Sequence, residues 1–108
     1  MIRGAVYTID LGDTKRGHEQ RGRRYGVVLS PSRMNRTMAT VVPVVPTSTS
    51  AQPAKFRPEL EVAGRTTRFL ADQIRSIDTA SILGDPVDVL GHDELAEVER
   101  AVAHYLEL

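Results

Sequence analysis

Arginines and hydroxyl residues are the side chains in this sequence whose types and spacing favour chemistry on a phosphate group. Where one predicted strand begins, the chain reads Arg21-Gly22-Arg23-Arg24, and where another ends it reads Thr47-Ser48-Thr49-Ser50. A guanidinium binds a phosphate through two parallel hydrogen bonds, and hydroxyls donate to phosphate oxygens. The two runs therefore predict either a phosphate-binding site or an ordinary solvent-exposed basic loop.

An RNA substrate would supply its own nucleophile to such a site, because its 2′-OH can attack the neighbouring phosphorus. The protein then has to orient the attack, stabilise the charge on the phosphorane and move two protons. An arginine and a threonine can supply the charge stabilisation without a metal ion. Proton transfer is the harder step, because a free arginine titrates above about 12.

The sequence lacks the residues that other common catalytic chemistries require. Cysteine is absent, which excludes disulfide scaffolds, cysteine-ligated zinc, iron–sulfur clusters and thiol catalysis. The three histidines, His18, His92 and His104, lie far apart and form no metal-binding pair at helical spacing. The chain also contains no glycine-rich nucleotide loop and no serine nucleophile motif. We therefore expect a metal-independent protein without a cofactor.

The zero net charge conceals a strong asymmetry along the chain. Residues 1–57 contain ten bases and three acids, whereas residues 82–108 contain one base and seven acids. Such a division favours one surface that faces a polyanion and another that faces elsewhere. Ordinary solvated charge is the alternative explanation.

The elements that must position these residues are predicted to be short strands followed by one helix. β-Branched and aromatic residues predict strands over residues 5–11, 25–30, 38–45, 56–62, 67–71 and 73–78. Pro43 indicates an edge, a bulge or a bend in the third of these strands. Residues 12–22 form a long polar loop between two strands, a candidate lid.

Apolar residues recur at helical spacing near the C-terminus, which predicts an amphipathic helix. Gly91 can serve as its N-cap, with Glu94 three residues further on. The stripe, which we expect in the core together with Tyr7 and Phe69, consists of Leu95, Val98, Val102, Tyr105 and Leu106.

The chain has 108 residues and a mass of 11.9 kDa, which is the size of one domain. The pattern predicts a mainly β fold with a C-terminal helix, as a small, partly antiparallel barrel over residues 1–108. No apolar run approaches the roughly 20 residues that a membrane span requires, and the N-terminus lacks the pattern of a signal peptide. A soluble cytoplasmic protein is therefore expected.

An ordered set of segments resembles the MazF/PemK (Kid-type) toxins, the ribonucleases of bacterial toxin–antitoxin pairs. No single segment is decisive, but order and spacing agree over nearly the whole chain. The matching segments lie at residues 3–11, 17–30, 44–48 and 70–78.

This resemblance implies an SH3-like barrel of the MazF/CcdB superfamily that works as a homodimer. It implies a metal-independent endoribonuclease that cuts single-stranded RNA at short sequence motifs and leaves 2′,3′-cyclic phosphate and 5′-OH ends. Cutting mRNA, or tRNA or rRNA, would block translation. A cognate antitoxin with an acidic or amphipathic tail would neutralise the toxin.

The resemblance also assigns site residues. The catalytic arginine of the family falls on Arg24 and its catalytic threonine on Thr47. The family usually has Arg-Pro where this chain has Arg24 followed by Tyr25, so Arg23 remains an alternative. The expected RNA-binding residues are His18, Glu19, Gln20, Arg23, Ser48 and Gln73, of which His18 is either a further proton carrier or a solvated loop residue.

Two alternatives to the nuclease remain at this point. CcdB-like proteins share the implied fold and act by binding DNA gyrase, and fold alone does not distinguish the two activities. The Arg24 and Thr47 pair favours the nuclease, because a gyrase binder needs neither side chain. An inactive family member that only binds RNA is the second alternative.

Overall fold

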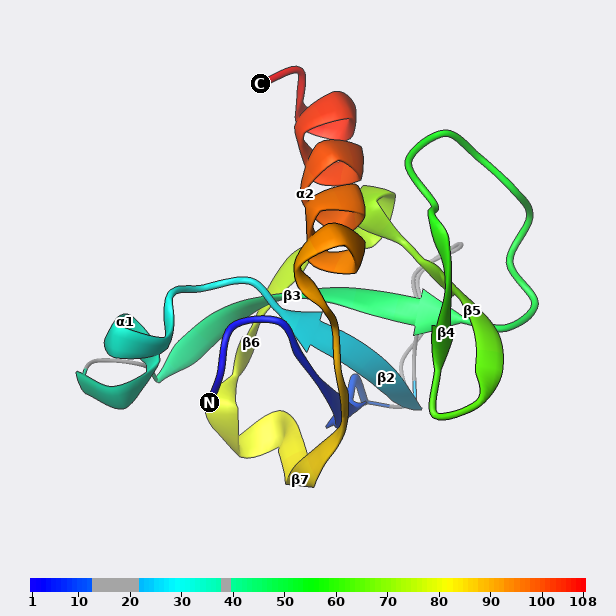
Figure 1. The fold of residues 1–108 in the computed structure, drawn as a ribbon. Helices are drawn as coiled ribbons and strands as arrows, with labels where there is room; N and C mark the ends of the chain where they lie inside the picture. The colour runs from blue at the N-terminus through cyan, green and yellow to red at the C-terminus, as the bar shows by residue number, and fades with distance from the viewer. Residues whose placement is uncertain (13–21, 38–39) are drawn as a thin grey trace.

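The chain forms one curled antiparallel sheet, and the helix at the C-terminus of the chain packs against this sheet (Figure 1). The computed structural model describes residues 1–12, 22–37 and 40–108. Neighbouring strands follow the order β4-β5-β3-β2-β1-β7, and β6 pairs with β3. The elements are β1 (Ala5–Asp10), β2 (Arg23–Val28), α1 (Ser32–Thr37), β3 (Val41–Ser48), β4 (Glu59–Val62), β5 (Arg65–Phe69), η1 (Ala71–Gln73), β6 (Arg75–Asp78), η2 (Thr79–Ser81), β7 (Ile82–Val89) and α2 (His92–Leu106).

Strand β3 pairs with three other strands, two of which share one of its edges. One edge of β3 pairs with β2, and Gly26 lies opposite Pro46. The other edge pairs first with β6, between Val41 and Val44, and then with β5, where Thr47 lies opposite Phe69. Strands β6 and β5 thus follow one another along one edge of β3 in a curled sheet (Figure 1). The mainly β, barrel-like fold with a C-terminal helix is confirmed.

The two faces of the sheet carry separate hydrophobic clusters. Alternation along a strand sends successive side chains to opposite faces. We call the cluster that α2 covers the Phe69 cluster; it consists of Val6, Val27, Val45, Val62, Phe69, Leu90 and Val98. The Ile9 cluster on the other face consists of Ala5, Tyr7, Ile9, Val28, Val42, Val44 and Ile77.

Helix α2 begins as the sequence predicts. Gly91 is the N-cap, and its backbone N–H donates to Oε1 of Glu94 at 2.9 Å. Val98 is completely buried, but the expectation that Tyr105 and Leu106 lie in the core is wrong. They remain 44% and 48% exposed, because the last turns of the helix extend beyond the sheet (Figure 1). Tyr105 contacts the ring of Phe56 edge-on.

Strand β7 and helix α1 were not predicted. β7 contains Gly84 and Pro86, which obscure a strand pattern. Its pairing with β1 shifts register between Val6 and Thr8, so its alternation is interrupted as well. The described ranges contain no helix that is long and apolar enough to cross a membrane.

Strand β3 also lies three residues further along the chain than predicted. It ends at Ser48, so Thr47 is part of the strand and does not follow it. The composition of residues 46–48 is typical of a loop. Pairing of Thr47 and Ser48 with β5 satisfies the backbone of this segment and makes it a strand.

Candidate phosphate-binding site

A pocket of about 420 Å³ opens where β2 begins and β3 ends, beside the hairpin of β4 and β5. Its volume is within the range of small-ligand sites. Strands β1 to β5 and the turn between β4 and β5 supply all of its lining except Thr49, so the sheet holds the lining residues in place. The lining consists of Thr8, Arg23, Arg24, Tyr25, Thr47, Ser48, Thr49, Val62, Ala63, Arg65 and Thr67.

Most of the polar lining lies on the face of the sheet that carries the Phe69 cluster. Thr8 lies opposite Tyr25, and Thr47 lies opposite Phe69. Opposed residues in an antiparallel pair point to the same face. The pocket therefore lies at the polar, open end of this face, and the Phe69 cluster lies at its other end.

Arg24 and Thr47 line the same pocket. Their strand positions differ, however. Arg24 lies opposite Ile9 and is therefore on the face of the Ile9 cluster. Arg23 is on the opposite face, that of the Phe69 cluster, together with Tyr25 and Val27. Arg23 therefore shares a face with Thr47. Both arginines reach the pocket because they occupy the first two positions of β2, at its open end.

Thr47 is nearly completely buried, with 3% of its surface exposed. Its Oγ1 donates a hydrogen bond to the backbone carbonyl of Tyr25 at 3.0 Å. A hydroxyl has one proton and two acceptor lone pairs. Thr47 must therefore release the Tyr25 carbonyl before it can donate to a phosphate oxygen.

Ser48 has a different hydrogen-bonding arrangement. Its Oγ accepts from the backbone N–H groups of Ser50 and Ala51, both at 3.1 Å. These bonds shape the turn after β3. Oγ of Ser48 also lies 3.5 Å from Oγ of Ser50, so the Ser48 proton has an acceptor within the same turn. Ser48 therefore supports the turn and lines the pocket.

The pocket is positively charged. Arg23, Arg24 and Arg65 line it, and none of the described lining residues is an aspartate or a glutamate. Elsewhere, Arg3, Arg57 and Arg68 each form an ion pair with a carboxylate. Guanidinium and hydroxyl donors without carboxylates suit an anion such as a phosphate.

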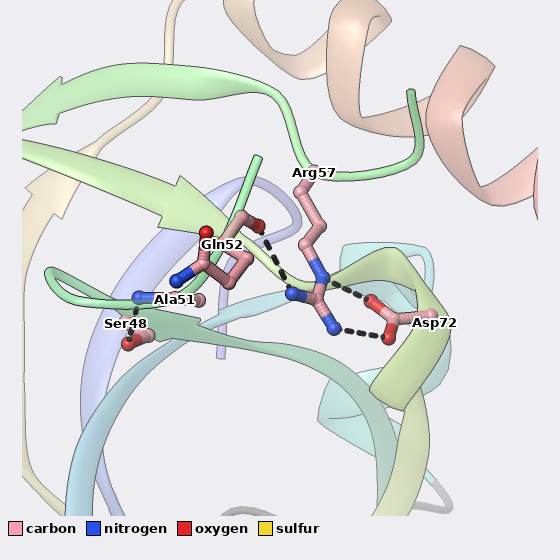
Figure 2. A network of polar contacts seen from close by, with 5 residues as sticks. All are labelled: Ser48, Ala51, Gln52, Arg57 and Asp72. Atoms are coloured by element: carbon pink, nitrogen blue, oxygen red, sulfur yellow. Dashed lines mark hydrogen bonds and ion pairs between the residues drawn. The ribbon is translucent and has the colours of Figure 1, made fainter. Parts of the chain in front are cut away.

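An ion pair outside the pocket holds the loop that follows β3 (Figure 2). Arg57 donates from Nε and Nη2 to the two carboxylate oxygens of Asp72, at 3.0 and 2.8 Å. Its Nη1 donates to the backbone carbonyl of Gln52 at 3.0 Å. The hydrogen bonds to Asp72 raise the pKa of Arg57 above its usual value. Both side chains are mostly buried, so this pair fixes the loop to η1.

The remaining predicted site residues have different outcomes. Arg23 and Ser48 lie in the pocket wall, but Gln73 lies in η1 and is not among the lining residues. His18, Glu19 and Gln20, with most of the predicted lid loop, lie outside the described residues.

Sequence reasoning missed several lining residues. They are Thr8, Tyr25, Arg65 and Thr67, which lie near Thr47 because of strand pairing. Alternation places Arg65, Thr67 and Phe69 on one face of β5. This alternation is visible in the sequence, but it does not show which strand β5 pairs with, and so it does not place Arg65 and Thr67 near Thr47.

The chain belongs to a known toxin family. Residues 2–106 match the model of the PemK-like, MazF-like toxins of type II toxin–antitoxin systems. Among its relatives is a Mycobacterium tuberculosis protein named as a candidate toxin, Rv3098A, 66% identical over 108 residues that cover all of this chain and 99% of the relative. The endoribonuclease MazF9 of the same organism is 34% identical over 119 residues, covering all of this chain and 98% of the relative.

Solved structures agree with this assignment. MazF from Deinococcus radiodurans superposes with a TM-score of 0.85 at 28% identity, covering all of this chain and 97% of the other. The MazE–MazF complex of the same organism gives a TM-score of 0.78 at 25% identity, with coverage of 100% and 96%. The resemblance stated from sequence segments is confirmed.

Proposed function

We propose that this protein is a sequence-specific, metal-independent endoribonuclease toxin that cuts single-stranded RNA. The observation that carries the proposal is the pocket that contains Arg24 and Thr47 together and is lined by arginines and hydroxyls without a carboxylate. Family membership and the endoribonuclease name of a full-length relative support the same activity.

In the proposed reaction, the 2′-OH of the RNA loses its proton and attacks the adjacent phosphorus, and the 5′ oxygen of the next nucleotide leaves and gains a proton. The products are a 2′,3′-cyclic phosphate and a 5′-OH end. The Arg24 guanidinium would orient the scissile phosphate, stabilise the charge of the phosphorane and take part in proton transfer. Thr47 would donate its hydroxyl to a phosphorane oxygen after leaving the Tyr25 carbonyl. Donors directed at developing charge are worth several kcal/mol in such sites.

Binding would involve further residues. Arg23 and Ser48 line the pocket and can contact the RNA backbone. We assign RNA-binding roles to His18, Glu19, Gln20 and Gln73 from the family resemblance. The pocket lies at the open end of one face of the sheet. An unpaired RNA strand is the proposed substrate, because specific RNA recognition usually targets unpaired nucleotides.

We also propose two protein partners: a second copy of the chain and a cognate antitoxin. The related MazF of Deinococcus radiodurans has been solved with MazE. An acidic antitoxin segment would complement the arginines of the pocket and compete with RNA. The toxin would act in the cytoplasm and inhibit translation by cutting RNA.

Purified protein incubated with a long single-stranded RNA in excess EDTA tests the activity. We expect discrete cleavage, no cleavage of single-stranded DNA, and resistance of an RNA that carries 2′-O-methyl at the cut site. Efficient cutting of the methylated RNA would exclude attack by the 2′-OH. Intact RNA together with inhibition of gyrase would favour a CcdB-like activity instead.

A further inference from the structure

The hairpin of β4 and β5 directs one arginine into the pocket from the wall opposite β2. Val62 lies opposite Arg65, so only Ala63 and Gly64 form the turn. Both have positive φ, 49° and 82°, as a tight type I′ turn requires. Alanine seldom adopts this conformation. The backbone N–H of Ala63 donates to Oδ2 of Asp88 in β7 at 3.0 Å, which holds the turn in place.

Arg65 and Arg68 lie on the same strand but have different surroundings. Arg68 pairs with Glu59 at 2.7 Å and donates to the carbonyl of Ala51. Arg65 shares the face of Thr67 and lines the pocket, and no ion pair is found for it within the described part of the chain. An exposed guanidinium without a carboxylate partner, beside two further arginines, favours a bound anion.

We propose that Arg65 binds a second phosphate of the RNA, adjacent to the scissile phosphate held by Arg24 and Thr47. This inference rests on the proposed function. β3 lies between β5 and β2, so Thr47 lies on the strand between those that carry the arginines. An extended RNA strand that crosses β3 would place successive phosphates against β2 and β5. Arg65 is therefore a binding residue that fixes the register of the RNA and takes no part in proton transfer.

The first test measures binding without cleavage. A fluorescent pool of 2′-O-methyl single-stranded RNA of mixed sequence is titrated with wild type, Arg65→Ala, Arg65→Lys and Arg100→Ala at several KCl concentrations. Arg100 is exposed on α2 and outside this pocket, so its loss gives the same charge change elsewhere. Melting temperatures establish that each variant is folded.

We expect Arg65→Ala to weaken binding by about three- to tenfold and to lower the slope of log Kd against log salt by about 0.7, the value of one phosphate contact on a single strand. Arg65→Lys should be intermediate, because an ammonium lacks the guanidinium fork. An affinity and slope equal to those of wild type would overturn the inference. A loss of the same size in Arg100→Ala would do so too, because it would reduce the effect to net charge.

The second test places the contact along the RNA. In an RNA that wild type cuts, each linkage next to the mapped cut site is replaced in turn by a neutral methylphosphonate. One replacement should weaken wild-type binding as much as Arg65→Ala does, and the two changes together should cause no further loss. Full additivity at both neighbouring linkages would contradict the assignment. Failure of wild type to cut any RNA would refute the proposed activity, whereas the salt slope would still decide whether Arg65 binds a phosphate.

Discussion

The hydroxyl of Thr47 donates to the backbone carbonyl of Tyr25 with 3.0 Å between the two oxygens. The side chain proposed to stabilise the phosphorane therefore also connects β3 to β2. Its single proton serves one acceptor at a time. Substrate binding would replace the carbonyl by a phosphate oxygen, so Thr47 contributes to the stability of the free protein and to the proposed reaction.

Removal of the Thr47 hydroxyl should therefore affect both stability and activity. Thr47→Val keeps the shape but leaves the Tyr25 carbonyl without its donor, which should lower the free energy of unfolding by about 1–3 kcal/mol. Cleavage in a single-turnover assay should fall by about 10²-fold, as expected for loss of one donor to the transition state. Thr47→Ser should retain most of both properties.

Thr67→Val is the matched control for this substitution. Thr67 is also 3% exposed, and its hydroxyl donates to a backbone carbonyl, that of Arg65, at 3.0 Å. Thr67 also lines the pocket but is assigned no contact with the phosphorane, so at saturating RNA the control should lose similar stability and keep most of the cleavage rate. An equal loss of cleavage in both variants would assign the effect to folding and not to catalysis.

The two neighbouring arginines should separate into a catalytic and a binding role. Arg24→Ala should lower the single-turnover rate by about 10²–10³-fold, and Arg24→Lys should restore little, because an ammonium does not reproduce the fork. Arg23→Ala should mainly weaken RNA binding and make it less dependent on salt. His18→Ala should change the rate by less than about tenfold if Arg24 carries the proton transfer.

The two arginines need to be compared directly, because Arg23, and not Arg24, lies on the same face of the sheet as Thr47. An Arg24→Ala variant with near wild-type rate, alongside an inactive Arg23→Ala variant, would transfer the catalytic role to Arg23.

The ion pair of Arg57 and Asp72 should stabilise the loop after β3. Both groups are mostly buried, so Arg57→Ala leaves a carboxylate without its partner and should cost about 3 kcal/mol in urea denaturation. The double variant with Asp72→Ala should lose less than the sum of the single losses. A similar cycle on Arg68 and Glu59, the more exposed pair, should yield a coupling below about 1 kcal/mol. Equal couplings would mean that burial does not govern the strength of these pairs.

Gly26 should be intolerant of a side chain because of Ile9. A Cβ at this position would lie 2.7 Å from Cδ1 of Ile9. Gly26→Ala should therefore destabilise the protein by about 1–3 kcal/mol in thermal unfolding, as overpacking does. Ile9→Val removes that methyl group, so the double variant should be more stable than additivity predicts. Strict additivity would show that the contact is not the cause.

The chain should form a homodimer at micromolar concentration. Apolar side chains remain exposed on β3, β7 and the N-terminal segment, among them Val41, Val89 and Ile2 at 57%, 55% and 57%. A two-fold partner could cover such a surface. Light scattering should give about twice 11.9 kDa. An active species of monomer mass would contradict this prediction.

Several features of this protein follow from the sequence alone because local rules govern them. β-Branched segments predict most of the strands, and Gly91 with Glu94 predicts the start of α2. The uneven charge and the Arg24 and Thr47 runs point to a phosphate site, since guanidinium and hydroxyl chemistry is a property of the residues themselves. The ordered segments were sufficient to indicate the family.

Only the tertiary structure decided which side chains meet. Strand alternation assigns residues to two faces of one strand, but hydrogen-bond register between strands decides which faces adjoin. That register extends β3 to Ser48, pairs β7 with β1 despite Gly84 and Pro86, and places Arg65 of the β4–β5 hairpin in the pocket wall. These pairings depend on the order of all the strands in the curled sheet, which no single segment determines.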